Sequence, residues 1–430
     1  MGRYSEYCES GAGWLGELPS HWQLRRISAL YDARNEKVSD QDYPPLSVTM
    51  QGIVPQLETA AKTQDGDNRK LVRTGDFVIN SRSDRRGACG ISTYDGSVTL
   101  ISNVLAPKDR NAMSTRYYSY LFRSEGFADE FYRQGTGIVD DLWSTNWSRM
   151  KNILVARPPL AEQESIADYL DAKTAEIDAL VADCEREVGL LQEYRKAVIS
   201  EAVTKGLDPD VPMKDSGVEW IGEIPVTWEP NTISGVTKMI TNGYVGPTRD
   251  LFVDEGVRYL QSLHIVNGVL DFEKHPYYVA DEWSMAHSRS VLNEGDVLVV
   301  QTGAIGNCAY VDESYAGCNC HALIVLRPDE TQVYGRYLYY YLTSDIGKEK
   351  MLLTRTGATH PHLNATKIKF THVVIPPLDE QRKLIAHLDA KTAEIDVLID
   401  AKRTMAEKLR EYRRSLISEA VTGKFKVPGV

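Results

Sequence analysis

Serine and arginine side chains gather directly after an apolar run in the first half of this 430-residue chain. The run is Asp76-Phe77-Val78-Ile79, which follows a glycine and is typical of a buried strand. Arginine pairs bidentately with guanine edges or with phosphate, and serine hydrogen-bonds to either. We therefore predict a nucleic-acid contact in the loop after this strand, with a basic pair nearby. The residues of this set are Ser81, Arg82, Ser83, Arg85 and Arg86, with Arg69 and Lys70.

The corresponding place in the second half carries uncharged polar side chains. Gln301 and Thr302 follow the apolar run Asp296–Val300, and glutamine can read adenine or phosphate. For any single residue, a solvated loop position is the plainer interpretation. As sets at equivalent positions in two divergent halves, they favour a binding surface. The further candidates are Asn242, Tyr244, Arg249, Gln261, Ser262, His264, Thr359, His360 and His362.

Motifs for catalysis or cofactor binding are weak in this sequence. It contains neither a G-x-x-x-x-G-K-[ST] phosphate loop nor an Asn/Asp-Pro-Pro-aromatic run, the motif of amino-methyltransferases. Cys308, Cys318, Cys320 and His321 have the side chains of a zinc site, but their spacing fits no strong pattern and favours buried cysteines. We therefore predict a chain that is not an enzyme by itself and binds no metal or cofactor of its own.

An internal repeat must position these candidates. Residues 158–207 return as residues 376–425 at a constant offset of 218, and 25 of the 50 positions are identical. A shorter echo, Trp14–Pro19 against Trp220–Pro225, marks the start of each half. Because this period is far longer than that of a solenoid repeat, we interpret the chain as two module-plus-helix units in tandem.

Each repeated segment is predicted to form one helix of about 45 residues, on the order of 65 Å long. Apolar residues recur at alternating steps of four and three, which indicates a coiled-coil seam. We expect the two helices to pair antiparallel; the alternative is that each packs on its own module. Asp171/Lys173 and Asp389/Lys391 are interpreted as surface or register-setting charges. The predicted seam residues are Ile166, Leu170, Ile177, Leu180, Leu191, Tyr194, Leu384, Leu388, Ile395, Leu398, Leu409 and Tyr412.

The predicted fold class is α/β (α+β), with two similar modules joined by two long helices in an antiparallel coiled coil of pseudo-two-fold symmetry. The modules span residues 1–157 and 217–375, the helices residues 158–207 and 376–425, and a polar, proline-bearing linker residues 208–216.

The formal net charge of −11 counts against nucleic-acid binding until it is located along the chain. Residues 13–157 sum to +2, residues 158–207 and 217–375 to −6 each, and residues 376–425 to +1. The acidic residues thus lie largely in the first helix and the second module. Overall charge does not decide whether the partner is DNA or protein.

The N-terminal stretch has no apolar signal core, and no run approaches the roughly 18 apolar residues of a membrane span. Six cysteines without framework spacing suggest a reducing compartment. We expect a cytoplasmic protein that does not bind a membrane.

Several short motifs together make the chain resemble the specificity subunit of a type I restriction-modification system. Their order, spacing and duplication carry the resemblance, which covers almost the whole chain. The motifs are Trp14–Pro19 with Trp22, Trp220–Pro225 with Trp228, Gly295–Leu298, Gly357–Asn364, and the Pro-Pro-Leu-x-Glu-Gln runs at 158–163 and 376–381.

This resemblance implies that the modules are target-recognition domains, each of which reads one half of a bipartite, asymmetric site in double-stranded DNA. The repeated helices would be conserved spacers. Two methyltransferase subunits would dock on the chain and use S-adenosylmethionine to methylate adenine. Restriction subunits would cleave DNA with ATP and Mg²⁺. The specificity subunit itself would be non-catalytic and would bind none of these cofactors.

Two other interpretations remain open at this stage. The chain could be a coiled-coil scaffold or adaptor whose modules bind proteins without DNA, which the acidic net charge favours. It could also be the specificity subunit of a system in which one fused polypeptide cuts and methylates.

Overall fold

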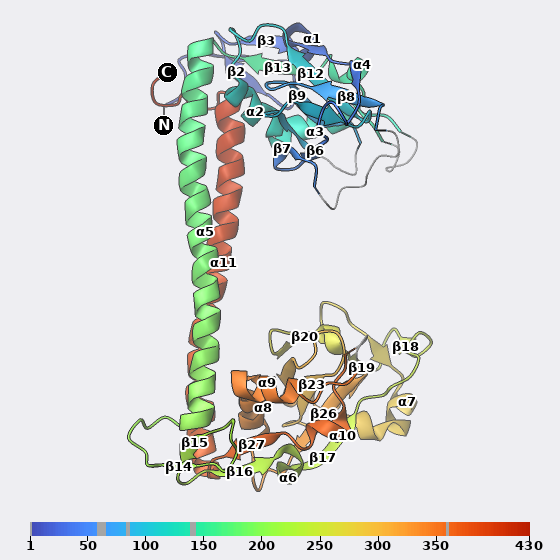
Figure 1. The fold of residues 1–430 in the computed structure, drawn as a ribbon, viewed down its shortest axis with the longest axis vertical. Coiled ribbons are helices and arrows are strands. Elements are labelled where there is room, and N and C mark those ends of the chain that lie inside the picture. The colour runs from blue at the N-terminus through green and yellow to red at the C-terminus, as the bar shows by residue number, and fades with distance from the viewer. Residues whose placement is uncertain (1, 58–65, 83–86, 138–142, 358–360) are drawn as a thin grey trace. The chain divides into compact units, whose positions relative to one another are not determined.

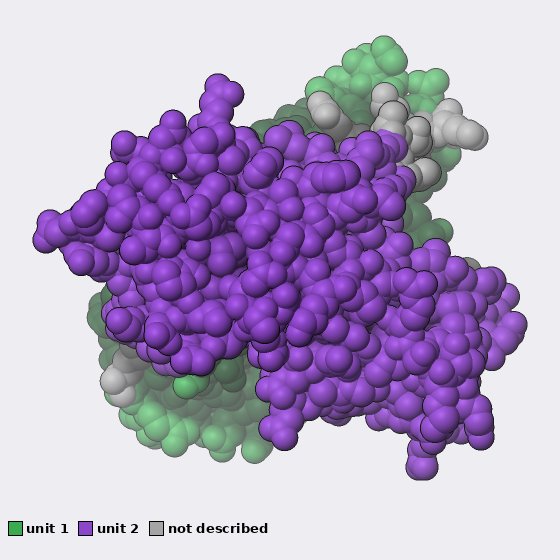
Figure 2. Space-filling model, turned by 90° about the horizontal axis from the view of Figure 1, so that it is seen from below, with its two compact units in different colours: residues 1–185, 403–430 green, residues 186–402 purple. Residues whose placement is uncertain are grey.

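The structure is a computed structural model of the chain. The residues that it describes are 2–57, 66–82, 87–137, 143–357 and 361–430. The chain divides into two compact units, of which unit 1 comprises residues 1–185 and 403–430 and unit 2 residues 186–402 (Figure 2). Within the described ranges, no helix combines the length and the apolar character needed to cross a membrane.

The two repeated segments are long helices, α5 (Leu160–Lys205) and α11 (Leu378–Val421), as predicted (Figure 1). Each helix contributes to both units, so the units do not coincide with the expected module and helix segments. In unit 1, Arg413 Nε lies 2.8 Å from Asp178 Oδ1, and Arg410 pairs with Glu185. The partner's number on α5 falls as the number on α11 rises, so the two helices run antiparallel there.

Unit 2 contains the same kind of helix pair. Arg195 Nε donates to Asp396 Oδ1 at 3.1 Å, and Lys402 pairs with Glu187. The contact between the two long helices is therefore confirmed within each unit, and Arg195–Asp396 is the repeat counterpart of Arg413–Asp178.

The apolar residues predicted for the seam are buried in the first turns of each helix. Toward the middle of each helix, other residues are buried than those predicted. Ile166, Leu170, Ile177, Leu384, Leu388 and Ile395 are buried. However, Leu180 and Leu398 are 41% and 45% exposed, and their neighbours Val181 and Ile399 are buried instead. The step after Ile177 is therefore four residues rather than three. A straight helix of 3.6 residues per turn drifts from a strict heptad repeat, which accounts for the shift.

Four further predicted seam positions also differ. Tyr194 and Tyr412 are 55% and 52% exposed, and Leu191 and Leu409 are only partly buried. Small and β-branched residues fill the interior nearby, among them Ala202, Val203, Ala420 and Val421.

The module of unit 1 is built from short antiparallel strands. Its central sheet has the order β10-β9-β12-β4, and the buried strand predicted after Gly75 is its β9. A three-stranded sheet, β11-β8-β5, and three strand pairs complete it. The bounds are β1 Tyr7–Glu9, β2 Glu17–Pro19, β3 Gln23–Arg26, β4 Tyr31–Ala33, β5 Lys37–Val38, β6 Leu46–Thr49, β7 Gly52–Pro55, β8 Arg69–Val72, β9 Phe77–Asn80, β10 Cys89–Ile91, β11 Gly96–Val98, β12 Ser102–Pro107 and β13 Leu154–Arg157. Its short helices are α1 Ile27–Leu30, α2 Thr115–Arg123, α3 Glu125–Arg133 and α4 Trp147–Met150.

Unit 2 repeats this arrangement with an enlarged second sheet. The sheet β17-β26-β23-β24 corresponds to the central sheet of unit 1, and the sheet β18-β22-β19-β25 contains one parallel pair, β19 with β25. The strands are β14 Met213–Asp215, β15 Glu223–Pro225, β16 Glu229–Thr232, β17 Thr237–Asn242, β18 Phe252–Val253, β19 Val257–Leu260, β20 Ile265–Val266, β21 Val269–Leu270, β22 Tyr278–Val279, β23 Val297–Val300, β24 Cys308–Tyr310, β25 Asn319–Cys320, β26 Leu323–Pro328 and β27 His372–Ile375. The helices are α6 Ile233–Val236, α7 Asp281–Ala286, α8 Gly335–Thr343, α9 Asp345–Leu352 and α10 Ala365–Ile368, with 3₁₀ turns at Ser262–His264, Ser288–Ser290 and Glu313–Tyr315.

Helices α2 and α8 attach each module to a long helix. Arg116 Nε and Tyr120 Oη donate to the carboxylate of Asp171 on α5 at 2.9 and 2.7 Å. In unit 2, Arg336 Nε and Tyr340 Oη donate to Asp389 on α11 at 2.9 and 2.5 Å. The prediction that these two aspartates set the register of the coiled coil was therefore wrong, because they bind the module; Asp171 does lie at the surface.

Candidate nucleic-acid interface

In unit 1, two segments far apart in sequence form one polar loop pair after strand β9. The backbone N–H of Thr145 donates to the carbonyl of Ser81 at 2.9 Å, and Ser144 Oγ lies 3.2 Å from Ser81 Oγ. Arg82 forms an isolated β-bridge with Ser144, and its N–H donates to Asn80 Oδ1 at 2.9 Å. The loop pair thus holds the backbone of Arg82 while its side chain is exposed.

Unit 2 builds the same backbone arrangement after strand β23. The N–H of Leu363 donates to the carbonyl of Gln301 at 2.9 Å. Thr356 and His362 exchange two backbone hydrogen bonds of 2.9 Å, as Thr136 and Ser144 do at 3.0 Å in unit 1.

The two loop pairs share their backbone pattern and differ in their side chains. Unit 1 presents the serines and the arginine, whereas unit 2 presents Gln301, Thr302 and the imidazole of His362, whose Nε2 lies 3.1 Å from Thr356 Oγ1. Arginine and glutamine make different hydrogen-bond patterns with base edges. Two surfaces that recognise different sequences can share one backbone arrangement, provided that their side chains offer different hydrogen-bond donors and acceptors.

Sequence reasoning missed five members of these loop pairs, which are Thr136, Ser144, Thr145, Thr356 and Leu363. The signal for them was the loose match between the stretches 135–146 and 357–364, which contain Thr136, Ser144 and His362 of the two bridges. Five predicted contact residues lie outside the described residues, and they are Ser83, Arg85, Arg86, Thr359 and His360.

Of two further predicted contacts in unit 1, Arg69 is buried and Lys70 is partly buried. Arg69 is 2% exposed, and its guanidinium donates to Ser97 Oγ and Ser97 O at 2.8 and 3.0 Å. Lys70 Nζ donates to the carbonyl of Ser102 at 2.8 Å. Burial lowers the pKa of both groups. Their placement in β8 favours a role in holding strands together rather than in contacting a ligand.

His264 of unit 2 is likewise buried. Its Nδ1 accepts the N–H of Gln261 at 2.8 Å, and its Nε2 lies 2.7 Å from the carbonyl of His275. These partners fix the neutral tautomer with the proton on Nε2, and burial lowers the pKa of the ring. The imidazole organises the turn, whereas Gln261 and Ser262 are partly exposed.

A second polar surface in unit 2 surrounds Tyr244. Its ring centroid lies 5.1 Å from the rings of Trp283 and His287, which stack on each other at 4.0 Å. The predicted Asn242 and Arg249 are exposed on the same loop segment. Trp283 and His287 carried no recognisable signal in the sequence, since a single tryptophan and a single histidine match no binding motif.

The sequence predicted no zinc site at Cys308, Cys318, Cys320 and His321. Cys308, Cys318 and Cys320 are buried, and burial raises the pKa of each thiol. Among the described residues, no group of three metal-binding side chains lies close enough together to hold an ion.

Comparison with known proteins adds the family context. Residues 225–402 match the family model described as the type I restriction modification DNA specificity domain. A putative type I restriction enzyme MjaX specificity subunit of Methanocaldococcus jannaschii is 22% identical, with 96% of each chain covered. The type I restriction enzyme EcoBI specificity subunit of Escherichia coli is 24% identical, with 64% of this chain and 59% of the relative covered.

Solved structures share the fold. A chain from a study of complex assembly and conformational transition of the type I R-M system aligns with a TM-score of 0.72 at 15% identity, covering 94% of this chain and 98% of that one. The HsdS subunit from Thermoanaerobacter tengcongensis aligns with a TM-score of 0.51 at 16% identity and the same coverage. The resemblance seen in the sequence motifs is confirmed.

Proposed function

We propose that the chain is the DNA-recognition subunit of a type I restriction-modification complex, because residues 225–402 match the model of the type I restriction modification DNA specificity domain. Each unit would read one half of a bipartite, asymmetric site in double-stranded DNA. The observation that carries this proposal is the pair of equivalent loop frames, at Ser81–Arg82 and at Gln301–Thr302, with different polar side chains.

The chemistry of the loops supports the assignment of a DNA ligand. Arg82 offers a guanidinium that can pair with a guanine edge or a phosphate, and Gln301 offers an amide that suits adenine. A protein ligand would not require that two equivalent frames present such different hydrogen-bond patterns. The acidic total charge does not oppose this, because the acidic residues lie largely in α5 and in the second module.

The chain would work as a non-catalytic member of its complex. Two methyltransferase subunits would bring S-adenosylmethionine, and restriction subunits would use ATP and Mg²⁺, in the cytoplasm. The antiparallel helix pairs α5 and α11 would scaffold these subunits.

Methylation mapping of single DNA molecules tests the proposal. Cells that express this chain with the methyltransferase encoded beside it should carry a gapped, asymmetric motif with one methylated adenine per strand. Deletion of this chain should abolish that methylation. An unchanged pattern, with an intact methyltransferase present, would leave a scaffold without a DNA role as the better account. Exchange of residues 13–157 for those of a relative should alter one half of the motif only, and an unaltered motif would contradict the modular assignment.

A further inference from the structure

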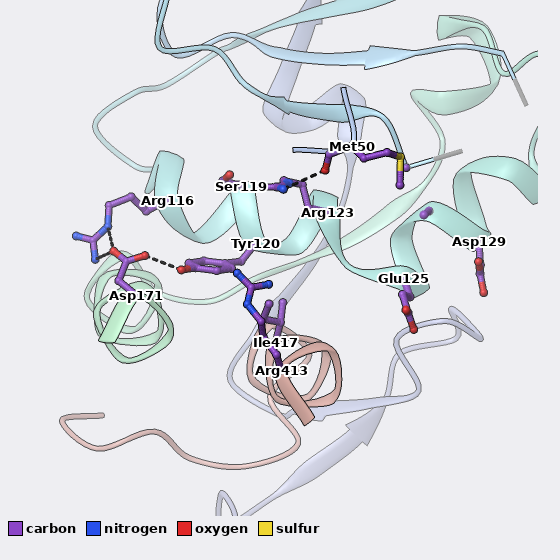
Figure 3. Close-up of a pocket in the computed structure, with 12 residues that line it drawn as sticks. Met50, Arg116, Ser119, Tyr120, Arg123, Glu125, Asp129, Asp171, Arg413 and Ile417 are labelled. Carbon is purple, nitrogen blue, oxygen red and sulfur yellow. Dashed lines mark hydrogen bonds and ion pairs between the residues drawn. The ribbon is translucent and has the colours of Figure 1, made fainter. Parts of the chain in front are cut away.

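Unit 1 contains an open pocket between its module and the long helices (Figure 3). The pocket has a volume of about 600 Å³ and lies beside Ser119, on the face of α2 that also carries Arg116 and Arg123. Arg413 and Ile417 of α11 form its opposite wall, and Met50 of the β6–β7 hairpin lies at its edge.

Unit 2 has a tyrosine at the position that corresponds to Ser119. Helices α2 and α8 align through Arg116 with Arg336 and through Tyr120 with Tyr340, since both pairs bind the equivalent aspartates of α5 and α11. Counting from these anchors places Tyr339 where unit 1 has Ser119.

The phenol ring of Tyr339 fills the space between α8, the long helices and the β20–β21 hairpin. The side chain is 4% exposed, and the guanidinium of Arg336 lies 5.3 Å from its ring centroid. Its hydroxyl reaches the hairpin turn, where a Cβ on Gly268 would come within 2.5 Å of the hydroxyl oxygen. Arg195, the repeat counterpart of Arg413, lies near Tyr339.

Unit 1 retains the surroundings of this ring without the ring. Arg116 and Arg413 occupy the places of Arg336 and Arg195, and the β6–β7 turn takes the place of the β20–β21 turn. The turn is held by Arg123, whose Nη2 donates to the carbonyl of Met50 at 3.1 Å. The serine therefore leaves open a volume that the duplicated copy of the fold fills with a phenol.

The charges of the lining favour a neutral occupant. Three arginines, at 116, 123 and 413, are balanced by Glu125, Asp129 and Asp171. Arg116 is engaged by Asp168 and Asp171, and Arg413 by Asp178. The lining therefore has no excess of positive charge, which a phosphate group would need. An aromatic ring, in contrast, can stack on a guanidinium that is already paired with a carboxylate.

We propose that the pocket beside Ser119 accepts a tyrosine side chain of a partner protein, in the position that Tyr339 occupies in unit 2. The α11 and α5 surfaces in unit 1 expose further large apolar side chains, Tyr412 at 52% and Leu180 at 41%, which a protein partner would cover. The inference is independent of DNA recognition, because it concerns a protein side chain and is tested without DNA.

The test uses the full chain labelled with ¹³C at the methionine methyl groups and 4-methylphenol, the side chain of tyrosine, as the probe. The Met50 resonance, assigned with Met50→Leu, should shift saturably at millimolar probe through the ring current. Ser119→Tyr should remove this response, and its own phenol should displace the Met50 resonance in the absence of probe. Ser165→Tyr, at a partly exposed position of α5 outside the pocket, is the matched control, because Ser119 is also partly exposed, and it should respond like the wild type. Ser119→Leu replaces Ser119→Tyr if the larger variant does not fold.

The assembled complex identifies the source of the occupant. When the chain is co-purified with the proteins encoded beside it, the Met50 resonance should no longer respond to the probe. Ser119→Tyr should weaken assembly at least tenfold relative to Ser165→Tyr. The proposal is overturned if Met50 does not respond in the free chain, if it still responds in the complex, or if the two variants assemble equally. It is also overturned if deoxyadenosine monophosphate shifts Met50 at lower concentrations than 4-methylphenol, because a nucleotide would then be the ligand.

Discussion

The carboxylate of Asp296 is fully buried against the guanidinium of Arg327, with its two oxygens 2.9 and 2.8 Å from Nε and Nη2. Asp76 and Arg34 form the same pair in unit 1, at 2.8 and 3.2 Å. Each carboxylate also accepts a backbone N–H three residues before it in the sequence. The hydrogen bonds that the guanidinium groups donate to these carboxylates raise the pKa of both arginines. The buried aspartates of Gly75-Asp76 and Gly295-Asp296 thus hold in place the strands β9 and β23, which precede the two polar loops.

Removal of the arginine should destabilise unit 2 strongly. Arg327→Met leaves the carboxylate of Asp296 buried without its charge partner, which costs about 3–5 kcal/mol in the free energy of unfolding. Combining it with Asp296→Leu should recover most of that loss, because an apolar pair replaces the ion pair. Hydrogen exchange of the β23 and β26 amides, followed by mass spectrometry, measures both. Arg289→Met, at an exposed arginine, should cost less than about 0.5 kcal/mol, and an equal loss there would refute the assignment.

The long helices could be predicted from sequence because both the repeat and the apolar spacing are local signals. The bounds observed, Leu160–Lys205 and Leu378–Val421, lie inside the repeated segments. The predicted seam was wrong at Leu180 and Leu398, which are exposed. Their neighbours Val181 and Ile399 are also apolar, so the heptad pattern does not distinguish a step of three residues from a step of four.

The loop frames could be predicted only in part. The position of Ser81 and Arg82 after a buried strand is a local signal, but their bonding to Ser144 and Thr145 joins residues more than 60 positions apart. Arg69 and His264 have side chains that suit a nucleic-acid contact, yet both are buried in the interior. Sequence alone does not report which polar side chain finds a partner inside the fold.

The buried imidazole of His264 should make unit 2 sensitive to acid. Burial lowers the pKa of His264 in the folded chain, whereas the unfolded chain titrates near the usual value of about 6.5. Below that pH the unfolded state binds a proton that the folded state does not, so stability falls as the pH falls. His264→Gln should remove up to about 1.4 kcal/mol per pH unit from this dependence. Urea unfolding at pH 7.5, 6.5 and 5.5 compares the two chains, and parallel curves would contradict the prediction.

The loop of unit 1 should contribute directly to DNA affinity. Once the target site is known, Arg82→Gln should weaken binding of the duplex about tenfold, since a lost bidentate contact is worth about 1–3 kcal/mol. If Arg82 contacts a phosphate, the slope of log affinity against log salt should also become shallower by about one. Fluorescence anisotropy over a range of salt concentrations measures both effects. Arg25→Gln, an exposed arginine of β3 in the same unit, is the control and should leave both quantities unchanged; a similar loss there would mean that only bulk charge matters.

Tyr339 should contribute to unit 2 both through its ring and through its hydroxyl, and two substitutions separate these contributions. Tyr339→Phe keeps the ring beside Arg336 and removes only the polar hydroxyl near Arg195, so it should cost about 1 kcal/mol of unfolding free energy or less. Tyr339→Ser reproduces the residue of unit 1 and leaves a cavity, so it should cost about 3–5 kcal/mol. Urea denaturation monitored by hydrogen exchange of the α8 amides measures the two losses.

The converse substitution, Ser119→Tyr, should leave the free energy of unfolding of unit 1 equal to or higher than that of the wild type. The wild-type pocket is already open, so the added ring displaces solvent and no side chain has to be expelled. A strong destabilisation by Ser119→Tyr, together with a mild effect of Tyr339→Ser, would mean that the two helices do not present equivalent spaces. The exchange of Ser119 for Tyr339 would then not explain why the site is open in unit 1 and filled in unit 2.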